Sequence, residues 1–469
     1  MLFNSLQFIF FFIVVTLAYY SLPHRGRIWI LLLASCYFYA VFKPIYILIL
    51  FVTIIVDYFA GIWIANNTGS KRKWILVLSL VSNIGFLAYF KYYNFFIENL
   101  NNTLFNFGSN AHFDLLDILL PIGLSFHTFQ AMSYTIEVYR GNQKAEKDFS
   151  IYALYVMFYP QLVAGPIERP QNLLWQFHTH FKYNFENIKA GLMRIAWGMF
   201  KKVVIADRLA MLVDYSYDNP LDHNGLTLLV ATIFFTFQIY CDFSGYSDIA
   251  IGTARVMGFK LMENFDAPYS STSISEFWRR WHISLSGWFR DYLYIPLGGN
   301  RVREYRKYFN LFFVFMMSGL WHGAAWTYIV WGALHGIYLV FAQLRDKYLP
   351  FSLSKSPNAP ITKFINLTIT FILVMFTWVF FRAKGMSNAK IIFKKIFSFS
   401  SYDAIATPFY FNEMIFCWVL IVILLLKDKF LRNISTQNTT KFYISFSILI
   451  ILCYFFGVFT SNQFIYFQF

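Results

Sequence analysis

Apolar stretches about as long as a bilayer crossing recur along almost the whole chain, and this feature constrains the fold most. The first covers residues 6–22 and the last residues 442–459, and one of them, residues 308–344, is long enough for two crossings. A spanning helix needs about 20 mainly apolar residues, and helices satisfy their own backbone hydrogen bonds in hydrocarbon. The sequence therefore predicts an all-α bundle of about a dozen membrane spans. We expect it to form one multi-span domain over residues 1–469, with no large soluble domain.

The composition agrees with a membrane as the solvent of this chain. Hydrophobic residues make up 58% and charged residues only 13%, against about 25% charged residues in soluble domains. Lys and Arg exceed Asp and Glu by 39 to 24, a balance that in a soluble chain would suggest nucleic acid. Here the basic residues lie in short loops beside apolar runs, so they indicate orientation signals and contacts with membrane lipids rather than nucleic-acid binding.

The basic residues of the early loops also predict a topology. Arg25 and Arg27 mark the first loop, Lys43 alone the second and residues 71–73 the third, while residues 99–113 hold no basic residue. Because basic loops stay in the cytoplasm, the N-terminus is predicted to lie outside it. The loop of Lys71, Arg72 and Lys73 is then cytoplasmic.

Two segments are amphipathic rather than uniformly apolar, residues 186–214 and 274–297. In the second, large apolar side chains repeat at helical spacing while the charged residues lie off that stripe. The repeating residues are Phe277, Trp281, Leu285 and Trp288. We expect this segment to form a helix that lies at the interface or enters the bundle beside a polar cavity.

Two histidines in these apolar surroundings are candidates for chemistry. His282 follows Trp281, and the alternative is an interfacial side chain satisfied by water or lipid phosphate. His322 lies deep in an apolar run, where ionisable groups usually face a cavity or a functional site. Gly319 and Gly323 flank it at the interval that lets helices approach closely, so a packing seam is the alternative. His335 points to another helix face and is predicted to be structural.

A third polar cluster, residues 238–248, places two carboxylates inside an apolar stretch. Asp242 and Asp248 could line a water-filled cavity or position a histidine, and a buried ion pair that fixes helix packing is an equal alternative. Residues 160–170 contain too many prolines for a regular helix. Such backbone must be covered by protein or lie near water.

Taken together, these strings resemble the membrane-bound O-acyltransferase superfamily. The resemblance is specifically to its bacterial alginate O-acetyltransferase branch, which also includes the D-alanyl transfer protein of teichoic acid synthesis. Several motifs match in the same order, which makes the signal strong. The matching strings are Leu120-Pro121-Ile122-Gly123-Leu124-Ser125-Phe126, Gly165-Pro166, Asp242-Phe243-Ser244-Gly245, Trp281-His282 and Trp321-His322-Gly323.

The resemblance implies a helical bundle with interfacial and re-entrant helices around a central tunnel. It also implies a catalytic role for His322 and a second active-site role for His282. An acyl donor on the cytoplasmic side would transfer its acyl group toward an acceptor on the far side. The chemistry suits histidine, because attack of a hydroxyl on a thioester needs a base that titrates near neutrality.

The donor expected from the resemblance is acetyl-CoA, with no permanently bound cofactor and no metal site. Arg279, Arg280 and Arg290 could hold its phosphates, since guanidinium groups match phosphate in bidentate fashion. Lipid phosphate at the interface is an equal alternative for these arginines. Asp242 is the further candidate for substrate binding.

The last eight residues, 462–469, carry no charged side chain but four aromatic ones. Similar aromatic tails occur in this acyltransferase branch. Tyr466 offers a phenolic hydroxyl that could accept an acyl group and pass it on. An aromatic anchor at the interface is the alternative that we favour for this tail.

The sequence thus predicts an O-acetyltransferase component in a bacterial cytoplasmic (inner) membrane. Its acceptor would be an extracytoplasmic cell-envelope polysaccharide, either peptidoglycan or an exported polysaccharide, reached with a separate SGNH-type O-acetyltransferase partner. D-alanyl transfer to teichoic acid is the first alternative. A proton-coupled transporter is the second, although the paired repeats with broken helices that it would require are not found.

Overall fold

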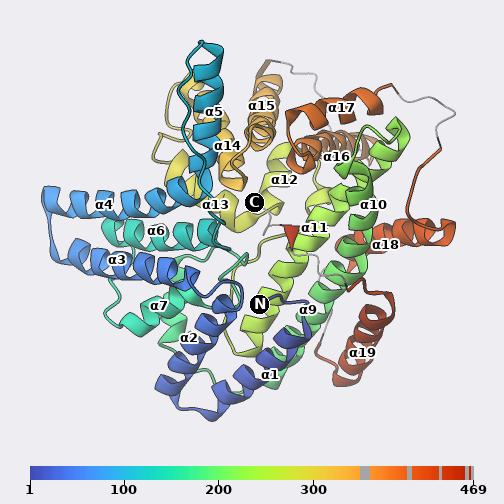
Figure 1. Ribbon diagram of the computed structural model, residues 1–469. Helices are drawn as coiled ribbons and strands as arrows, with labels where there is room; N and C mark the ends of the chain where they lie inside the picture. The colour runs from blue at the N-terminus through green and yellow to red at the C-terminus, as the bar shows by residue number, and fades with distance from the viewer. Residues whose placement is uncertain (349–359, 399–403, 432–435, 460–463, 466–469) are drawn as a thin grey trace. The chain divides into compact units, whose positions relative to one another are not determined.

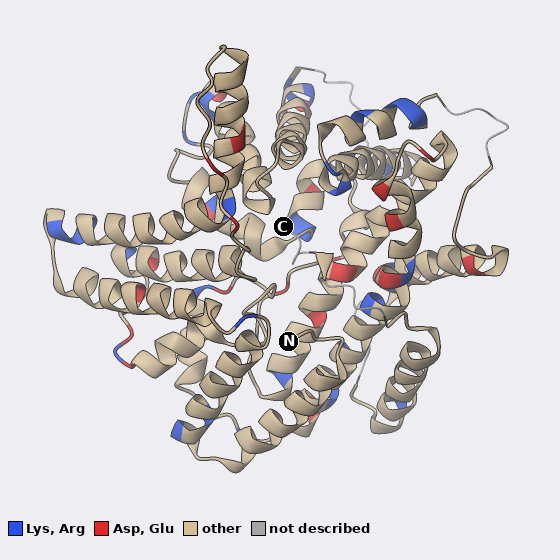
Figure 2. Cartoon of the chain, in the orientation of Figure 1, with Lys and Arg blue, Asp and Glu red and all other residues tan. Residues whose placement is uncertain are grey.

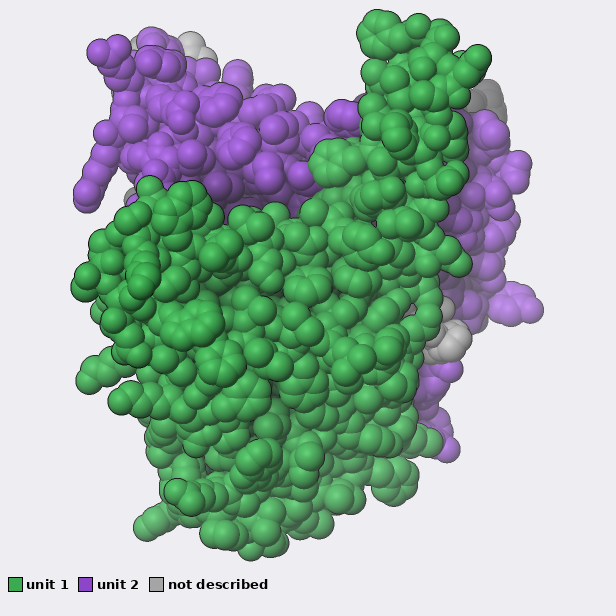
Figure 3. All heavy atoms as spheres, turned by 60° about the vertical axis from the view of Figure 1, so that its left-hand side comes forward, with its two compact units in different colours: residues 1–195, 247–262 green, residues 196–246, 263–469 purple. Residues whose placement is uncertain are grey.

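The structure, a computed structural model, describes residues 1–348, 360–398, 404–431, 436–459 and 464–465 (Figure 1). Every regular element in these ranges is helical, so the predicted all-α class is confirmed. The chain divides into two compact units, residues 1–195 with 247–262 and residues 196–246 with 263–469 (Figure 3). Helices α9 (Phe185–Met199) and α11 (Gly225–Val256) contribute to both units, and one membrane domain remains our expectation.

Unit 1 consists mainly of helices that follow the first apolar runs of the sequence. They are α1 (Leu6–Ser21), α2 (His24–Ala40), α3 (Tyr46–Asn66), α4 (Gly69–Leu87), the π-helical turn η1 (Ala88–Tyr92), α5 (Tyr93–Asn106), α6 (Leu124–Arg140), α7 (Phe149–Met157) and α8 (Pro170–Phe177). Local signals fix several of the ends, because a side-chain oxygen at the N-cap satisfies a free backbone N–H. Ser5 caps α1 in this way and Asp148 caps α7.

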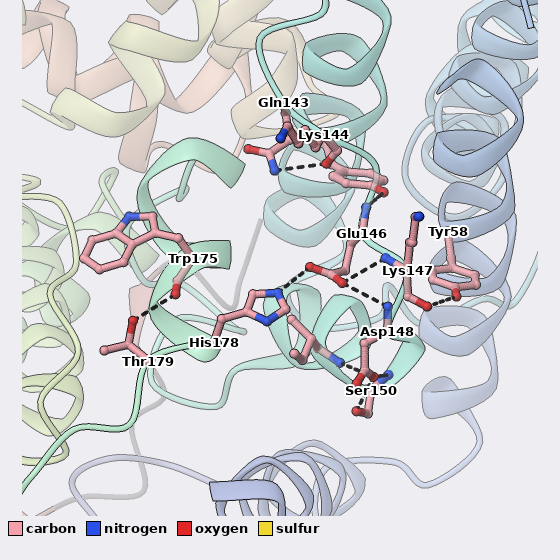
Figure 4. Close-up of polar contacts among 12 residues, drawn as sticks. Tyr58, Gln143, Lys144, Glu146, Lys147, Asp148, Ser150, Trp175, His178 and Thr179 are labelled. Atoms are coloured by element: carbon pink, nitrogen blue, oxygen red, sulfur yellow. Dashed lines mark hydrogen bonds and ion pairs between the residues drawn. The ribbon is translucent and has the colours of Figure 1, made fainter. Parts of the chain in front are cut away.

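The loop between α6 and α7 shows how such a cap is built (Figure 4). The Asp148 carboxylate accepts from the backbone N–H of Ser150 at 2.9 Å and from its hydroxyl at 2.6 Å. Glu146 accepts from the backbone N–H groups of Lys147 and Asp148 and lies 2.8 Å from Nε2 of His178. These contacts join the start of α7 to the end of α8.

Unit 2 contains the second amphipathic segment and the later apolar runs. Its elements are η2 (Phe200–Ala206), α10 (Asp207–Asp218), η3 (Pro268–Ser270), α12 (Ile274–Arg280), α13 (Ile283–Phe289), η4 (Arg290–Tyr294), α14 (Glu304–His322), α15 (Trp326–Tyr348), α16 (Pro360–Arg382), α17 (Met386–Ile396), α18 (Phe411–Phe430) and α19 (Thr439–Phe456). The long run at residues 308–344, which is long enough for two crossings, forms two helices, α14 and α15, and of these α15 is long and apolar enough to cross a membrane.

Six helical segments of the described chain are long and apolar enough to cross a membrane. They are residues 46–66, 69–106, 225–256, 326–348, 360–382 and 439–456. These segments indicate a multi-pass membrane protein. Along most of the helices the charged residues are few (Figure 2). The count is lower than the dozen expected because several apolar runs form short or polar helices: α7 has nine residues, and α6 buries His127, Gln130 and Glu137.

The two amphipathic segments fold differently from each other. Residues 185–218 form a continuous helical stretch, α9–η2–α10, in which the π-helical turn buries Lys201 and Lys202. Residues 274–294 do not form the single helix that their periodicity predicts, because the chain breaks between α12 and α13 at Trp281 and His282. Backbone hydrogen bonds to residues 264 and 266 fix this break. Periodicity detects the apolar face of a helix and not such a long-range contact.

The proline-rich stretch at residues 160–170 is covered by protein, which is the first of the two alternatives that the sequence left open. Ten of its eleven residues are buried and only Arg169 is partly exposed. The amide of Gln161 donates to the carbonyl of Tyr155 at 2.9 Å, and the carboxylate of Glu168 accepts from the backbone N–H of Met262 at 2.5 Å. Its irregular backbone is also bonded by protein groups: the N–H groups of Gln161 and Gly165 donate to the carbonyls of Phe158 and Gln161, and the carbonyl of Glu168 accepts from the hydroxyl of Tyr155.

Candidate active site

His282 lies at the break between α12 and α13 and is completely buried. Its backbone is left-handed, with φ 43° and ψ 54°, a conformation that is uncommon for residues other than glycine. Nδ1 of its ring lies 3.0 Å from Oδ1 of Asn264, which is also completely buried. The burial of His282 and the contact of its ring with Asn264 therefore fix the position of the imidazole.

His322 is the last residue of α14 and is 3% exposed. The turn that follows places it against α15, because α14 and α15 approach very closely through their glycines. A Cβ atom on Gly319 would collide with the carbonyl of Tyr328, and one on Gly332 with the carbonyl of Phe315. The close helix packing at Gly319, which the sequence offered as the alternative to a functional site, is therefore present. The same end of α14 also carries the buried His322.

The two histidines come together inside unit 2. Their ring centroids are 6.3 Å apart with 55° between the ring planes. Aromatic rings surround the pair: Phe243 lies 4.6 Å from His282, and Trp331 lies 5.1 Å from His322. Trp321 contacts both rings, at 6.2 Å and 5.0 Å. Two imidazoles in a largely apolar enclosure can exchange protons with a reacting group while little water competes.

His335 is bound differently, in agreement with the structural role expected for it. The indole N–H of Trp278 points to its Nδ1 at 3.3 Å, and its Nε2 lies 3.0 Å from the hydroxyl of Thr377. Both ring nitrogens are thus bonded to neighbouring helices, α12 and α16.

The three arginines predicted to bind phosphate differ in their surroundings. Arg279 is exposed, and the side chain of Arg290 is 66% exposed while it bonds to Asp291 at 2.8 Å. Arg280 instead lies 2.8 Å from Glu276 and 3.6 Å from Asp266. Arg279 and Arg290 are therefore more accessible to a phosphate than Arg280 is.

Asp242 lies in a buried ion cluster with lysine and a second carboxylate. Its Oδ1 is 2.5 Å from Nζ of Lys202, which also lies 2.8 Å from Asp207. Its Oδ2 accepts from the backbone N–H of Ile465 at 2.7 Å. Asp242 thus binds the chain's own C-terminal segment.

The C-terminal segment is anchored where the structure describes it. The ring of Phe464 is 1% exposed, packs edge-on against Tyr246 and lies 4.4 Å from Nζ of Lys202. Tyr466, the candidate acyl relay, lies outside the described residues, directly after Ile465.

Two polar residues of this region escaped sequence reasoning. No motif in the sequence points to Asn264, and Lys202 is one of several basic residues in an amphipathic segment. Their importance is visible only from contacts with residues that are distant in the sequence. Within the described ranges, no group of three His, Cys, Asp or Glu side chains is arranged to hold a metal ion.

The described chain is thus a helical bundle with segments long and apolar enough to cross a membrane, and it buries two histidines in an aromatic enclosure. Residues 148–382 match the sequence model of the membrane-bound O-acyltransferase family, and this range includes His282 and His322. The chain belongs to that family and is an O-acyltransferase.

Several relatives are similar over most of the chain. The probable alginate O-acetylase of Pseudomonas aeruginosa is 41% identical over 409 residues, which cover 86% of this chain and 76% of that protein. The peptidoglycan O-acetyltransferase of Helicobacter pylori is 37% identical over 433 residues, covering 84% and 79%. The teichoic acid D-alanyltransferase of Streptococcus thermophilus is 32% identical over 283 residues, covering 55% and 68%.

Proposed function

We propose that this chain is a membrane O-acetyltransferase that takes an acetyl group from acetyl-CoA at the cytoplasmic side of a bacterial inner membrane. It passes the group across for O-acetylation of an extracytoplasmic cell-envelope polysaccharide. The observation that carries this proposal is the pair of buried histidines, 6.3 Å apart, in a member of this family. The similarity to an alginate and a peptidoglycan O-acetyltransferase supports acetyl as the acyl group and a glycan as the acceptor.

In the proposed reaction His322 acts as the general base. It removes the proton of the acceptor hydroxyl while the oxygen attacks the thioester carbonyl, the new C–O ester bond forms and the C–S bond breaks. The proton then moves to the departing thiolate, and His282 shares or orients it. The surrounding aromatic rings keep water away from the thioester, which would otherwise be hydrolysed.

The exposed Arg279 and Arg290 are the proposed contacts for the phosphates of the donor. Bidentate arginine–phosphate pairs are both strong and directional, and neither side chain is buried by its own neighbours. Asp242 and Arg280 remain substrate-binding candidates, although each already has partners within the chain.

His322→Ala tests the proposal directly. Removal of a general base costs about two to four orders of magnitude in rate, so acetylation of the envelope glycan should be lost while the protein remains inserted. The measurement is mass spectrometry of the glycan fraction from cells expressing the variant. His112→Ala, at an exposed position, is the matched control and should acetylate normally. Normal acetylation by an equally expressed His322→Ala variant would remove His322 from the mechanism.

We also propose a test of Tyr466 as an acyl relay to a separate SGNH-type transferase outside the cytoplasm, against the aromatic anchor that the sequence favours. The Phe464–Ile465 pair directly before it is bound to the Asp242 cluster, which is compatible with both roles. A relay needs the hydroxyl, whereas an aromatic anchor needs only the ring. Tyr466→Phe should therefore assemble normally, lose glycan acetylation and carry no acetyl group on its C-terminal peptide. Full glycan acetylation by this variant would leave the tail as an anchor.

Transfer of D-alanine to teichoic acid is the second candidate. It is favoured only by the D-alanyltransferase relatives, and the Streptococcus thermophilus protein matches 55% of the chain. The same mass spectrometry separates the two, since an acetyl ester and a D-alanyl ester differ in mass.

A further inference from the structure

The environment of His282 indicates how its ring is prepared for proton transfer. Oδ1 of Asn264 is approached by three groups at once: Nδ1 of His282 at 3.0 Å, the hydroxyl of Ser284 at 2.9 Å and the backbone N–H of Ser284 at 3.3 Å. A backbone N–H can only donate, so the atom facing it must be the amide oxygen of Asn264.

The protonation of the imidazole follows from this assignment. An amide oxygen cannot donate a hydrogen bond, so the proton between Asn264 and His282 must be on Nδ1 of the histidine. In the neutral ring the lone pair is then on Nε2, which is the nitrogen that can accept a proton. His335 shows the opposite arrangement, because Trp278 donates to its Nδ1 and its Nε2 therefore carries the hydrogen.

Asn264 also holds the backbone on which the ring is mounted. Its carbonyl accepts from the N–H of Ile283 at 2.9 Å, and two residues further the N–H of Asp266 donates to the carbonyl of Arg280 at 3.0 Å. These bonds bracket His282, whose left-handed backbone needs such support to persist. Asn264 thus fixes both the position of His282 and the choice of its protonated nitrogen.

We infer that Asn264 is a positioning residue for acyl transfer, which it serves by holding His282 as the Nδ1–H tautomer with Nε2 as the proton-accepting nitrogen. This inference rests on the proposed function and extends it to a residue outside the pair of histidines. Asn264 acts through His282 and need not touch the donor or the acceptor.

Replacing the amide of Asn264 by a carboxylate separates a positioning role from a purely structural one, because a purely structural role would not change the pH dependence of the rate. Asn264→Asp keeps an oxygen that can accept from His282 and from Ser284, but its negative charge favours the imidazolium ion. His282 must be neutral to share the proton, so activity should be lost as the pH falls through the pKa of its ring. Burial lowers that pKa to about 3 in the wild type, so a rise of about one to three units should bring an acid limb to about pH 4–6, with activity recovered at higher pH.

The assay uses membrane vesicles that hold the full chain, its SGNH-type transferase partner and the acceptor glycan, with radiolabelled acetyl-CoA supplied on the cytoplasmic side as the probe. Initial rates are measured at saturating donor from about pH 4 to about pH 9, because burial places the pKa of His282 below the range of free imidazole. Asn264→Ala should lower kcat about tenfold or more at every pH, as does loss of the group that orients a catalytic imidazole elsewhere, while KM for acetyl-CoA stays unchanged. Ser284→Ala is the matched control: it removes one hydrogen bond to the same oxygen and should keep the wild-type profile.

The outcomes separate the inference from the proposed function. A wild-type chain that transfers no label from acetyl-CoA would refute the proposed function. An active wild-type chain with an Asn264→Asp profile that superimposes on it would overturn the role of Asn264 alone. If Asn264→Ala fails to accumulate, the Asn264→Asp profile still decides, because activity regained at high pH shows that this variant is folded.

Discussion

Replacing Lys202 by methionine should destabilise the protein strongly. Its ammonium group lies 2.5 Å from Asp242 and 2.8 Å from Asp207, and all three side chains are at most 4% exposed. Methionine has a similar length but no charge, so the substitution leaves two carboxylates buried without their shared cation. The backbone N–H of Ile465 would remain bonded to Asp242, which is too little to replace a full positive charge.

The size of the effect follows from the burial of the cluster. Removing one partner of a buried ion pair costs about 3–5 kcal/mol. One kcal/mol moves the melting midpoint of a unit this large by about 2 °C, so a fall of about 6–10 °C is expected. The double variant Lys202→Met with Asp242→Asn should have a higher melting midpoint than Lys202→Met alone, because one of the two negative charges left without Lys202 is then also removed.

The assay is thermal unfolding of the detergent-purified full chain, followed by loss of the monodisperse protein. Lys347→Met is the matched control, since this lysine pairs with Glu304 at a solvent-exposed position and such pairs contribute little. Equal midpoints for Lys202→Met and Lys347→Met would show that the buried cluster contributes nothing. No recovery in the double variant would show that the loss arises from packing rather than from charge.

Two further predictions concern unit 1. A cysteine at Lys71, in the first turn of α4 rather than in a loop, should resist impermeant thiol reagents in intact cells and react after permeabilisation, because this basic end of α4 is predicted to be cytoplasmic; labelling from outside would invert the topology. Asp148→Ala should lower the free energy of unfolding by about 1 kcal/mol through loss of the α7 cap, measured by thermal unfolding near neutral pH. Partial burial raises the pKa of Asp148, but hydrogen bonds from Ser150 and Ile151 lower it, and the net effect is a lowered pKa. The stabilisation is therefore present above about pH 4 and disappears on further acidification, and a difference between Asp148→Ala and wild type that persists unchanged in acid would contradict it.

The positions of the helices could be read from the sequence because helix formation in a membrane depends mainly on local properties. A run of apolar residues must satisfy its backbone hydrogen bonds within itself, so residues 308–344 predict α14 and α15 without knowledge of any neighbour. His322 could be selected for a similar reason, since a polar side chain within such a run is costly unless it has a use.

The arrangement of the candidate site depended on contacts that no local pattern records. The spacing of Phe277 and Trp281 predicts an unbroken helix, whereas hydrogen bonds from residues 264 and 266 stop it at His282. His335 and His322 lie in similar apolar surroundings in the sequence, and only Trp278 and Thr377 show that His335 is held at both nitrogens.

The sequence by itself thus determined that this is a helical membrane protein and which histidines are candidates for chemistry. The tertiary structure decided that His282 and His322 face each other, that Asn264 holds one of them, and that Asp242 binds Lys202 and the C-terminal segment. The physical reason is the range of the interactions. The apolar runs and helical hydrogen bonds that form a helix involve residues close together in the sequence. The candidate site instead combines side chains from distant segments, which only tertiary packing brings together.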